Sequence, residues 1–260
     1  AYVIMIILIW IPMARRKSLA FLDVGQGDCF VADTKSGAII FDGGSSSEDQ
    51  VGRYRILPYM KYLGYQKIQI AVISHMDIDH YSGIKELLEM GKIKYLGLPE
   101  IPKDETMKKI IGIAKKRGTT IFYLSRGRQI TTKDGSLKVL HPQKNSQMEK
   151  NAASLVMQGK ILGYRVLLTG DVEKEGEEEL LSEELERADI LKAAHHGSKN
   201  STSNEFLQKV QPKQTVISCG KQNRYGHPHL ETIHRLQTYR TKIYRTDRSG
   251  AIIFFKRRDG

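Results

Sequence analysis

Side chains that bind divalent metals are concentrated in one short segment of the chain, SHMDIDH. It holds four of them within six residues, namely His75, Asp77, Asp79 and His80. Such a group is costly to hold together unless a cation neutralises the carboxylates and accepts the imidazole lone pairs. Two-residue alternation along an extended segment would aim His75, Asp77 and Asp79 to one side. The segment is therefore predicted to hold a metal, with a polar surface turn as the alternative.

Two further aspartates follow apolar, strand-like segments. Asp171 ends LLTGD, where Gly170 lets the backbone approach a neighbour closely, and Asp42 lies in IIFDGG. Taken alone, Asp171 would cap a helix and Asp42 would stabilise a turn. Beside the first cluster, Asp171 becomes a candidate metal ligand. Asp42 and Asp28 are then expected to orient the ligands.

A third cluster lies in ADILKAAHHGSKNS, where an apolar segment ends in His195 and His196, with Ser198 just beyond. Adjacent side chains on a strand point in opposite directions, so we expect one histidine to reach a metal and the other to pack or to support a ligand. His195 is the preferred ligand. Ser198 is expected to support the ligands.

The segment CGKQNRYGHPH is the candidate for binding substrate. Its polar and aromatic side chains are Lys221, Asn223, Arg224, Tyr225 and His227. A lone histidine here would more often be structural, but histidine and two cations near a metal pair suit a phosphate group. With Asp79, His227 is the candidate for a direct part in catalysis.

These residues need elements to position them, and the chain alternates predicted strands with predicted helices. We expect strands over 18–23, 28–33, 37–42, 67–74, 119–123, 136–140, 153–158, 163–169, 189–194, 214–219, 242–246 and 250–256. We expect helices over 51–63, 81–90, 173–185, 203–210 and 229–239. Two such halves predict two sheets with helices outside, a four-layer αββα sandwich, and a site where strand ends from both halves meet.

Composition supports a packed globular protein. Of 260 residues, 40% are hydrophobic and 27% charged, which excludes a disordered chain or a polytopic membrane protein. Two cysteines cannot build a disulfide framework. The net charge of +12 is concentrated toward the C-terminus, with ten basic residues against two acidic ones over 221–258. Such a surplus attracts polyanions and anionic lipids, although solvated surface charge is the simpler alternative.

The first residues form the one membrane-like feature. Residues 1–13 are apolar and are followed by Arg15, Arg16 and Lys17. As a helix they would span ~20 Å, short of the ~30 Å hydrocarbon core. We expect 1–17 to be the end of a longer membrane segment with a basic linker, and 18–260 to be the domain that carries the clusters described above. A signal-peptide core, and hence a secreted protein, is the alternative.

The pattern HxDxDH, followed by GD and HHGS, resembles the metallo-β-lactamase superfamily. The usual motif of that superfamily is HxHxDH, and this chain has Asp77 where the motif has its second histidine. Over residues 18–256 the combination is similar to the C-terminal domain of the ComEC family of DNA-internalisation competence proteins. The segments that carry this likeness are FLDVGQGD, FDGG, SHMDIDH, NAASLV, LLTGD, KAAHHGS and NRYGHP.

The resemblance implies a two-metal nuclease that degrades the DNA strand that is not transported. By motif, His75 and Asp77 would hold one metal. Asp79 and His80 would face the other, Asp171 would bridge, and His195 or His196 would complete the second site. In the family a third histidine of the first site lies between HxHxDH and GD. The only histidine in that interval here is His141, and the segment NAASLV has Asn151 as another candidate. Oxygen-rich ligands favour Mn²⁺ over Zn²⁺ for the two ions.

The same resemblance suggests the partners and the location. It implies single-stranded DNA bound without sequence preference, a membrane reached through the preceding hydrophobic segment, and proteins of the competence machinery. The domain is expected at the cell membrane, facing outward, although the basic cluster at 15–17 favours the cytoplasmic side. Two other functions stay open: a free-standing hydrolase of small esters, lactones or cyclic phosphodiesters, and a non-catalytic module that guides DNA.

Overall fold

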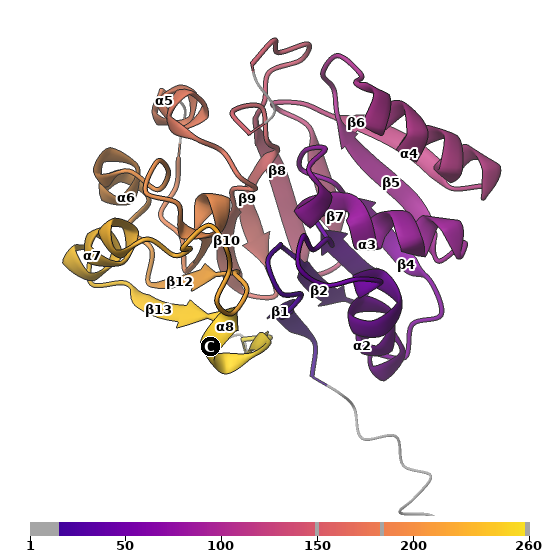
Figure 1. Cartoon of the computed structure of the whole chain (residues 1–260), viewed down its shortest axis with the longest axis horizontal. Helices are drawn as coiled ribbons and strands as arrows, with labels where there is room; N and C mark the ends of the chain where they lie inside the picture. Colours follow the sequence, from indigo (N-terminus) through magenta and orange to yellow (C-terminus); the bar gives the residue numbers. More distant parts are fainter. Residues whose placement is uncertain (1–15, 149–150, 183–184, 258–260) are drawn as a thin grey trace, which may run out of the picture.

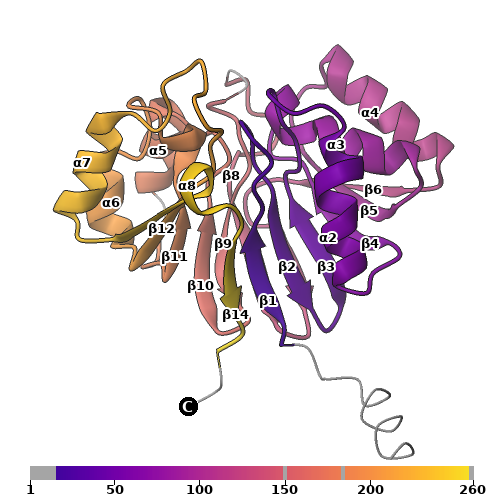
Figure 2. The same ribbon diagram turned by 60° about the horizontal axis from the view of Figure 1, so that its bottom comes forward.

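The computed structural model describes residues 16–148, 151–182 and 185–257. Two mixed sheets of seven strands each form its centre (Figure 2). The first sheet has the order β14 (Ile252–Phe255), β1 (Ser18–Phe21), β2 (Phe30–Thr34), β3 (Gly37–Phe41), β4 (Ile68–Val72), β5 (Ile93–Pro99) and β6 (Thr120–Leu124). The second has the order β13 (Lys242–Arg245), β12 (Gln214–Ile217), β11 (Ile190–Lys192), β10 (Tyr164–Leu168), β9 (Val156–Ile161), β8 (Gly135–His141) and β7 (Gln129–Thr132).

Helices cover the outer face of each sheet (Figures 1 and 2). Those on the first sheet are η1 (Gly52–Ile56), a π-helical turn that continues into α2 (Leu57–Tyr62), then α3 (Ile78–Glu89) and α4 (Glu105–Lys116). Those on the second are α5 (Lys174–Leu181), α6 (Asn204–Val210) and α7 (Leu230–Thr238). Two short turns, η2 (Ala194–Gly197) and α8 (Thr246–Ser249), complete the described elements. The predicted four-layer αββα sandwich is confirmed.

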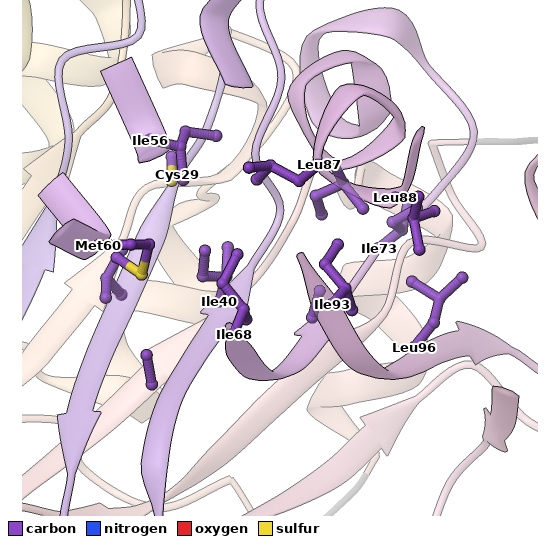
Figure 3. Close-up of a cluster of buried hydrophobic side chains, with 14 of the residues drawn as sticks. Cys29, Ile40, Ile56, Met60, Ile68, Ile73, Leu87, Leu88, Ile93 and Leu96 are labelled. Carbon is purple, nitrogen blue, oxygen red and sulfur yellow. The ribbon is translucent and has the colours of Figure 1, made fainter. Parts of the chain in front are cut away.

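Alternating side chains build separate hydrophobic layers. On β1, Leu19 and Phe21 join the cluster between the two sheets, whereas Ala20 joins the cluster under the first helical layer. That outer cluster includes Ile40 from β3 and Leu87 from α3, both fully buried (Figure 3). Each such side chain contributes roughly 1.5–3 kcal/mol when it leaves water. The central strands β1 to β3 are therefore buried on both faces.

Several predicted elements differ from the observed ones. Strand β5, helix α4 and strand β7 were not predicted. Helix α4 does carry the expected pattern, because Met107, Ile110 and Ala114 are buried on one face and the Asp104 side chain accepts a hydrogen bond from the Met107 amide. Its many lysines, which lie on the exposed face, obscure that pattern. Among the described residues no helix is long and apolar enough to cross a membrane, and the predicted membrane segment at 1–13 lies outside them.

Candidate metal centre

The first metal-binding cluster lies where β4 leaves the first sheet and α3 begins. Asp77 is the extended residue that precedes the helix, so Asp79 and His80 lie in the first helical turn. The predicted strand alternation is therefore wrong beyond Asp77. Because Asp79 and His80 lie in a helical turn, their side chains point in directions about 100° apart and do not alternate as on a strand. His75 and His80 nevertheless come together, with their ring centroids 4.1 Å apart.

Two glycine-containing loops pack directly against this turn. The Asp28 amide donates to the Asp79 carbonyl at 3.0 Å, and the Gly43 amide donates to the His80 carbonyl at 2.8 Å. A Cβ atom on Gly44 would lie 2.6 Å from the backbone of Asp79 and His80. The contact thus requires a residue without a side chain at this position. The loops around Asp28 and Gly44 thus hold the metal-binding segment in place through backbone contacts.

The second half contributes Asp171, His195 and His196. Asp171 follows Gly170 after β10, and the two histidines follow β11 in the turn η2. Both histidines have left-handed backbones, with φ of 47° at His195 and 52° at His196. The strand geometry expected for the pair is therefore wrong, and the two rings do not simply alternate. Their ring centroids lie 6.1 Å apart, and Nε2 of each ring lies within 4 Å of Oδ2 of Asp171.

Three imidazole Nε2 atoms from the two halves converge on carboxylates. From Oδ2 of Asp171, the Nε2 atom of His80 lies 3.1 Å away and that of His196 lies 3.3 Å away. Nε2 of His196 also lies 3.4 Å from Oδ2 of Asp79. Nε2 of His75 lies 3.7 Å from Oδ2 of Asp77. The described residues include no hydrogen-bond acceptor or donor that pairs with any of these three nitrogens.

The opposite nitrogen of each ring is held by the protein. The Nδ1 atom of His80 donates to Asp42 at 3.0 Å, and that of His196 donates to the Ser218 carbonyl at 2.9 Å. His75 Nδ1 pairs with the Ser74 hydroxyl at 3.0 Å. A proton fixed on Nδ1 leaves the lone pair on Nε2, which is how histidines are prepared to bind metals. Buried Nε2 atoms without partners beside three carboxylates therefore fit divalent metal.

The electrostatics of the centre agree with a cation site. Burial disfavours charge on His196, but the carboxylates of Asp171 and Asp28 outweigh it and raise its pKa to about 10. Burial would raise the pKa of Asp79, but the neighbouring imidazoles of His196 and His80 outweigh it and lower the pKa to about 2. Protons on these imidazoles thus supply positive charge that a metal ion would replace.

Lys192 is a central residue that sequence reasoning missed. It ends β11 and is 4% exposed, and its ammonium pairs with Asp28 and lies 3.3 Å from Oδ1 of Asp171. It also donates to the Gly170 carbonyl at 2.8 Å. The sequence does carry a signal, because a lysine in the apolar run ILKAA must find a buried counter-charge. This lysine fixes one oxygen of Asp171 and leaves the other facing the imidazoles.

Asp28 itself could complete a metal site by distance alone. Asp28, His80, Asp171 and His196 each offer a ligand atom within 4.8 Å of the others. However, Lys192 already neutralises Asp28, and the nearest imidazole nitrogen of His80 to Asp28 is Nδ1, on the protein side. Asp79 instead lies beside Nε2 of His196, at 3.4 Å. The geometry therefore favours Asp79 over Asp28 as a ligand.

His195 differs from His196 in its surroundings. Its Nδ1 atom pairs with Glu173 at 2.8 Å, and its Nε2 atom lies 3.9 Å from Oδ2 of Asp171. Its side chain is 24% exposed, whereas that of His196 is 1% exposed. The structure thus favours His196 over the predicted His195 as the ligand nearest Asp79. It places His195 at the rim.

The remaining candidates near the centre have structural contacts. His141 uses both nitrogens within the fold, on Glu179 at 3.1 Å and on the Ala152 carbonyl at 2.7 Å. The carbonyl of Asn151 accepts from the Ser154 amide. The Ser198 hydroxyl accepts from the Asn200 amide at 3.3 Å. These contacts organise turns and supply no third histidine to the first site.

The predicted substrate segment forms a loop over the centre. The Asn223 side chain holds this loop, because its amide donates to the Gly220 and His227 carbonyls and its oxygen accepts from the Tyr225 and His227 amides. His227 lies 5.4 Å from His195, ring to ring, and its Nδ1 atom pairs with none of the described groups. Burial and the neighbouring histidines lower the pKa of His227 to about 4. Lys221, Arg224 and Tyr225 are exposed.

Comparisons with known proteins agree with this geometry. The family model of the metallo-beta-lactamase superfamily matches residues 22–221. ComE operon protein 3 of Bacillus subtilis (strain 168) is 35% identical over 99% of this chain and 35% of its own length. Competence protein ComA of Neisseria gonorrhoeae is 30% identical over 92% of this chain and 32% of its own length. The chain thus spans about a third of the length of these curated relatives.

Solved structures share the fold. The metallo-beta-lactamase fold protein YhfI from Bacillus subtilis superposes with a TM-score of 0.62 at 13% identity, over 91% of this chain and 99% of that one. The chain therefore belongs to the metallo-β-lactamase superfamily, and its relatives include competence proteins.

Proposed function

We propose that this chain is the hydrolase domain of a DNA-uptake competence protein and that its metal centre cleaves phosphodiester bonds in the strand that is not transported. The observation that carries the proposal is the convergence of three unpartnered Nε2 atoms on the carboxylates of Asp77, Asp79 and Asp171. The names of the curated relatives and the net charge of +12 support a DNA substrate.

Two divalent ions fit the donor set. Asp79, His80, Asp171 and His196 would hold one, and His75, Asp77 and Asp171 would hold the other. The first of these groups has two carboxylates and two imidazoles, and the second has two carboxylates and one imidazole, so the centre is rich in oxygen ligands. The carboxylate oxygens favour Mn²⁺, whereas the imidazoles are also suitable ligands for Zn²⁺. When bound, such ions lower the pKa of water and polarise the phosphoryl group.

The chain's own groups orient and hold the substrate. Asp42 and the Ser218 carbonyl keep protons on the Nδ1 atoms of His80 and His196. His227 is neutral at pH 7, since its pKa is about 4, and its ring N–H is available to donate to a phosphate or leaving-group oxygen. Lys221 and Arg224 supply positive charge at the rim. The proposed place of this domain is the outer side of the cell membrane.

The test combines cleavage with metal content. The purified chain is assayed on single-stranded DNA with Mn²⁺, with a chelator, and as Asp171→Ala, while elemental analysis counts the bound ions. We expect cleavage only by the metal-loaded wild-type chain. His227→Gln is the matched control, since it lies outside the ligand set and should keep the metal while losing turnover.

Three outcomes would contradict the proposal. Cleavage that survives chelation excludes a metal-dependent reaction. Preferential hydrolysis of a lactone or a cyclic phosphodiester in competition with DNA indicates a small-molecule hydrolase. A chain that takes up no metal from Mn²⁺ solution and still binds DNA without cutting it indicates a guiding module.

A further inference from the structure

Two rings of the loop at 220–229, those of His227 and Tyr225, continue outward from the ring of His196 in η2. The ring of His196 lies 6.1 Å from that of His227, at an interplanar angle of 30°. The ring of His227 lies 5.6 Å from that of Tyr225, at 21°. Gly226, with φ of 70°, reverses the chain between the two and allows their rings to stack. One ring, that of His227, therefore lies between Tyr225 and the candidate metal ligand His196.

Tyr225 presents an aromatic surface to solvent beside this centre. Its side chain is 43% exposed, and the Arg224 guanidinium lies over its ring, 4.9 Å from the centroid. No described carboxylate pairs with Arg224 in the structure, and its hydrogen bond is to the Tyr225 hydroxyl at 2.7 Å. Arg224 thus lies where a planar group is favourable, and its contacts with described side chains are those with the Tyr225 ring and hydroxyl.

The same stack points at a phosphate-binding position. The Nδ1 atom of His227 has no partner among the described groups, and the residue is 9% exposed. A phosphate beside the metals and His227 would therefore have its neighbouring base beside Tyr225.

We infer that Tyr225 is a base-stacking residue, and that the nucleobase next to the scissile phosphate replaces the Arg224 guanidinium on its ring while Arg224 pairs with the backbone. This inference rests on the proposed function and names its substrate class as nucleic acid with unpaired bases. A base in a duplex already stacks on its neighbours and must leave the helix to reach such a surface. The centre then selects single strands by stacking and not by sequence.

The test measures binding separately from cleavage. Fluorescein-labelled oligothymidylate, the same strand with abasic positions, and a duplex are titrated by anisotropy at low salt with a chelator present. The proteins are the wild-type chain, Tyr225→Ala, Tyr225→Phe and Tyr123→Ala. Tyr123 is the matched control, since it is 37% exposed with a lysine ammonium 5.0 Å from its ring centroid, on strand β6.

We expect Tyr225→Ala to bind oligothymidylate about tenfold more weakly, the loss of one stacked base. It should bind the abasic strand as the wild type does. Tyr225→Phe and Tyr123→Ala should retain the wild-type preference for bases. Equal binding of thymidylate, abasic and duplex strands by the wild type, or an unchanged preference in Tyr225→Ala, overturns the inference even if Mn²⁺-dependent cleavage is observed. Absence of cleavage in Mn²⁺ with the stacking preference intact overturns the proposed function alone.

Discussion

The ammonium of Lys192 lies 3.3 Å from Oδ1 of Asp171, so this carboxylate is shared between an internal cation and the proposed metal centre. Its other oxygen, Oδ2, faces the imidazoles of His80 and His196. Lys192 also pairs with Asp28, which is buried. The lysine therefore supplies permanent positive charge behind a site whose remaining charge depends on protons or metal.

Replacing this lysine should destabilise the chain in a metal-dependent way. In Lys192→Met, Asp28 and Asp171 lose their buried counter-charge, which costs about 3–5 kcal/mol and lowers the thermal midpoint by roughly 10 °C without metal. Added Mn²⁺ should recover part of this loss. Differential scanning calorimetry with chelator and with Mn²⁺ measures both effects. The exposed Lys116→Met is the control, and equal midpoints for the two variants would refute the assignment.

The two adjacent histidines should differ in metal affinity. His196→Ala removes an Nε2 atom that faces both Asp79 and Asp171, so we expect Mn²⁺ to bind about 100-fold more weakly or not at all. His195→Ala removes a rim residue paired with Glu173 and should change the affinity by less than about tenfold. Competition with a fluorescent chelator gives both constants. A larger loss in His195→Ala would reverse the assignment.

The close approach at Gly44 gives a prediction that couples packing to the site. In Gly44→Ala the new Cβ would lie 2.6 Å from the start of α3, so the helix must shift and carry Asp79 and His80 with it. We expect weaker Mn²⁺ binding and a lower thermal midpoint. Gly112→Ala, in α4 with no atom within 4 Å of the new Cβ, should instead stabilise the helix by about 0.5–1 kcal/mol. Unchanged metal binding in Gly44→Ala would show that the contact is dispensable.

A buried aspartate remote from the centre predicts acid sensitivity. Burial would raise the pKa of Asp189, but the Arg165 amide and the Lys213 ammonium outweigh it and lower the pKa to about 2, below its ordinary 3.8. Because the folded pKa is depressed, the stabilisation is present above about pH 4 and is lost as the pH falls toward 2.

The matching substitution is Asp189→Asn. Its cationic partners are substantially exposed, so we expect a loss of about 1–2 kcal/mol at pH 7, less than the full shift implies. Urea unfolding at several pH values should show the gap between wild type and variant closing below pH 4. A gap that stays constant down to pH 3 would contradict the role of the charge.

The sequence singled out residues that the structure brings together, but it did not predict their geometry. The types and spacing of His75, Asp79 and His80 predict a metal cluster, because such groups are costly to hold together without a cation. Their exact directions depend on where α3 begins, and the helix starts inside the motif at Ile78. That start is set by contacts with the loops at Asp28 and Gly43, which are distant in sequence.

The choice between His195 and His196 was also beyond local reasoning. Both have left-handed backbones, a conformation that local patterns of apolar residues do not reveal. The role of Lys192 depends on Asp28, which comes from the opposite half of the fold. The strands and the layers can be predicted from the pattern of apolar residues within each segment. An ion pair between the two halves can be found only once the tertiary structure is known.

The pairing of β14 with β1 joins the end of the described chain to its beginning. Until residues 252–255 have been synthesised, β1 presents a bare hydrogen-bonding edge on its outer side. A nascent or truncated chain would therefore expose a strand that recruits copies of itself, and the first sheet is complete only once β14 has been translated.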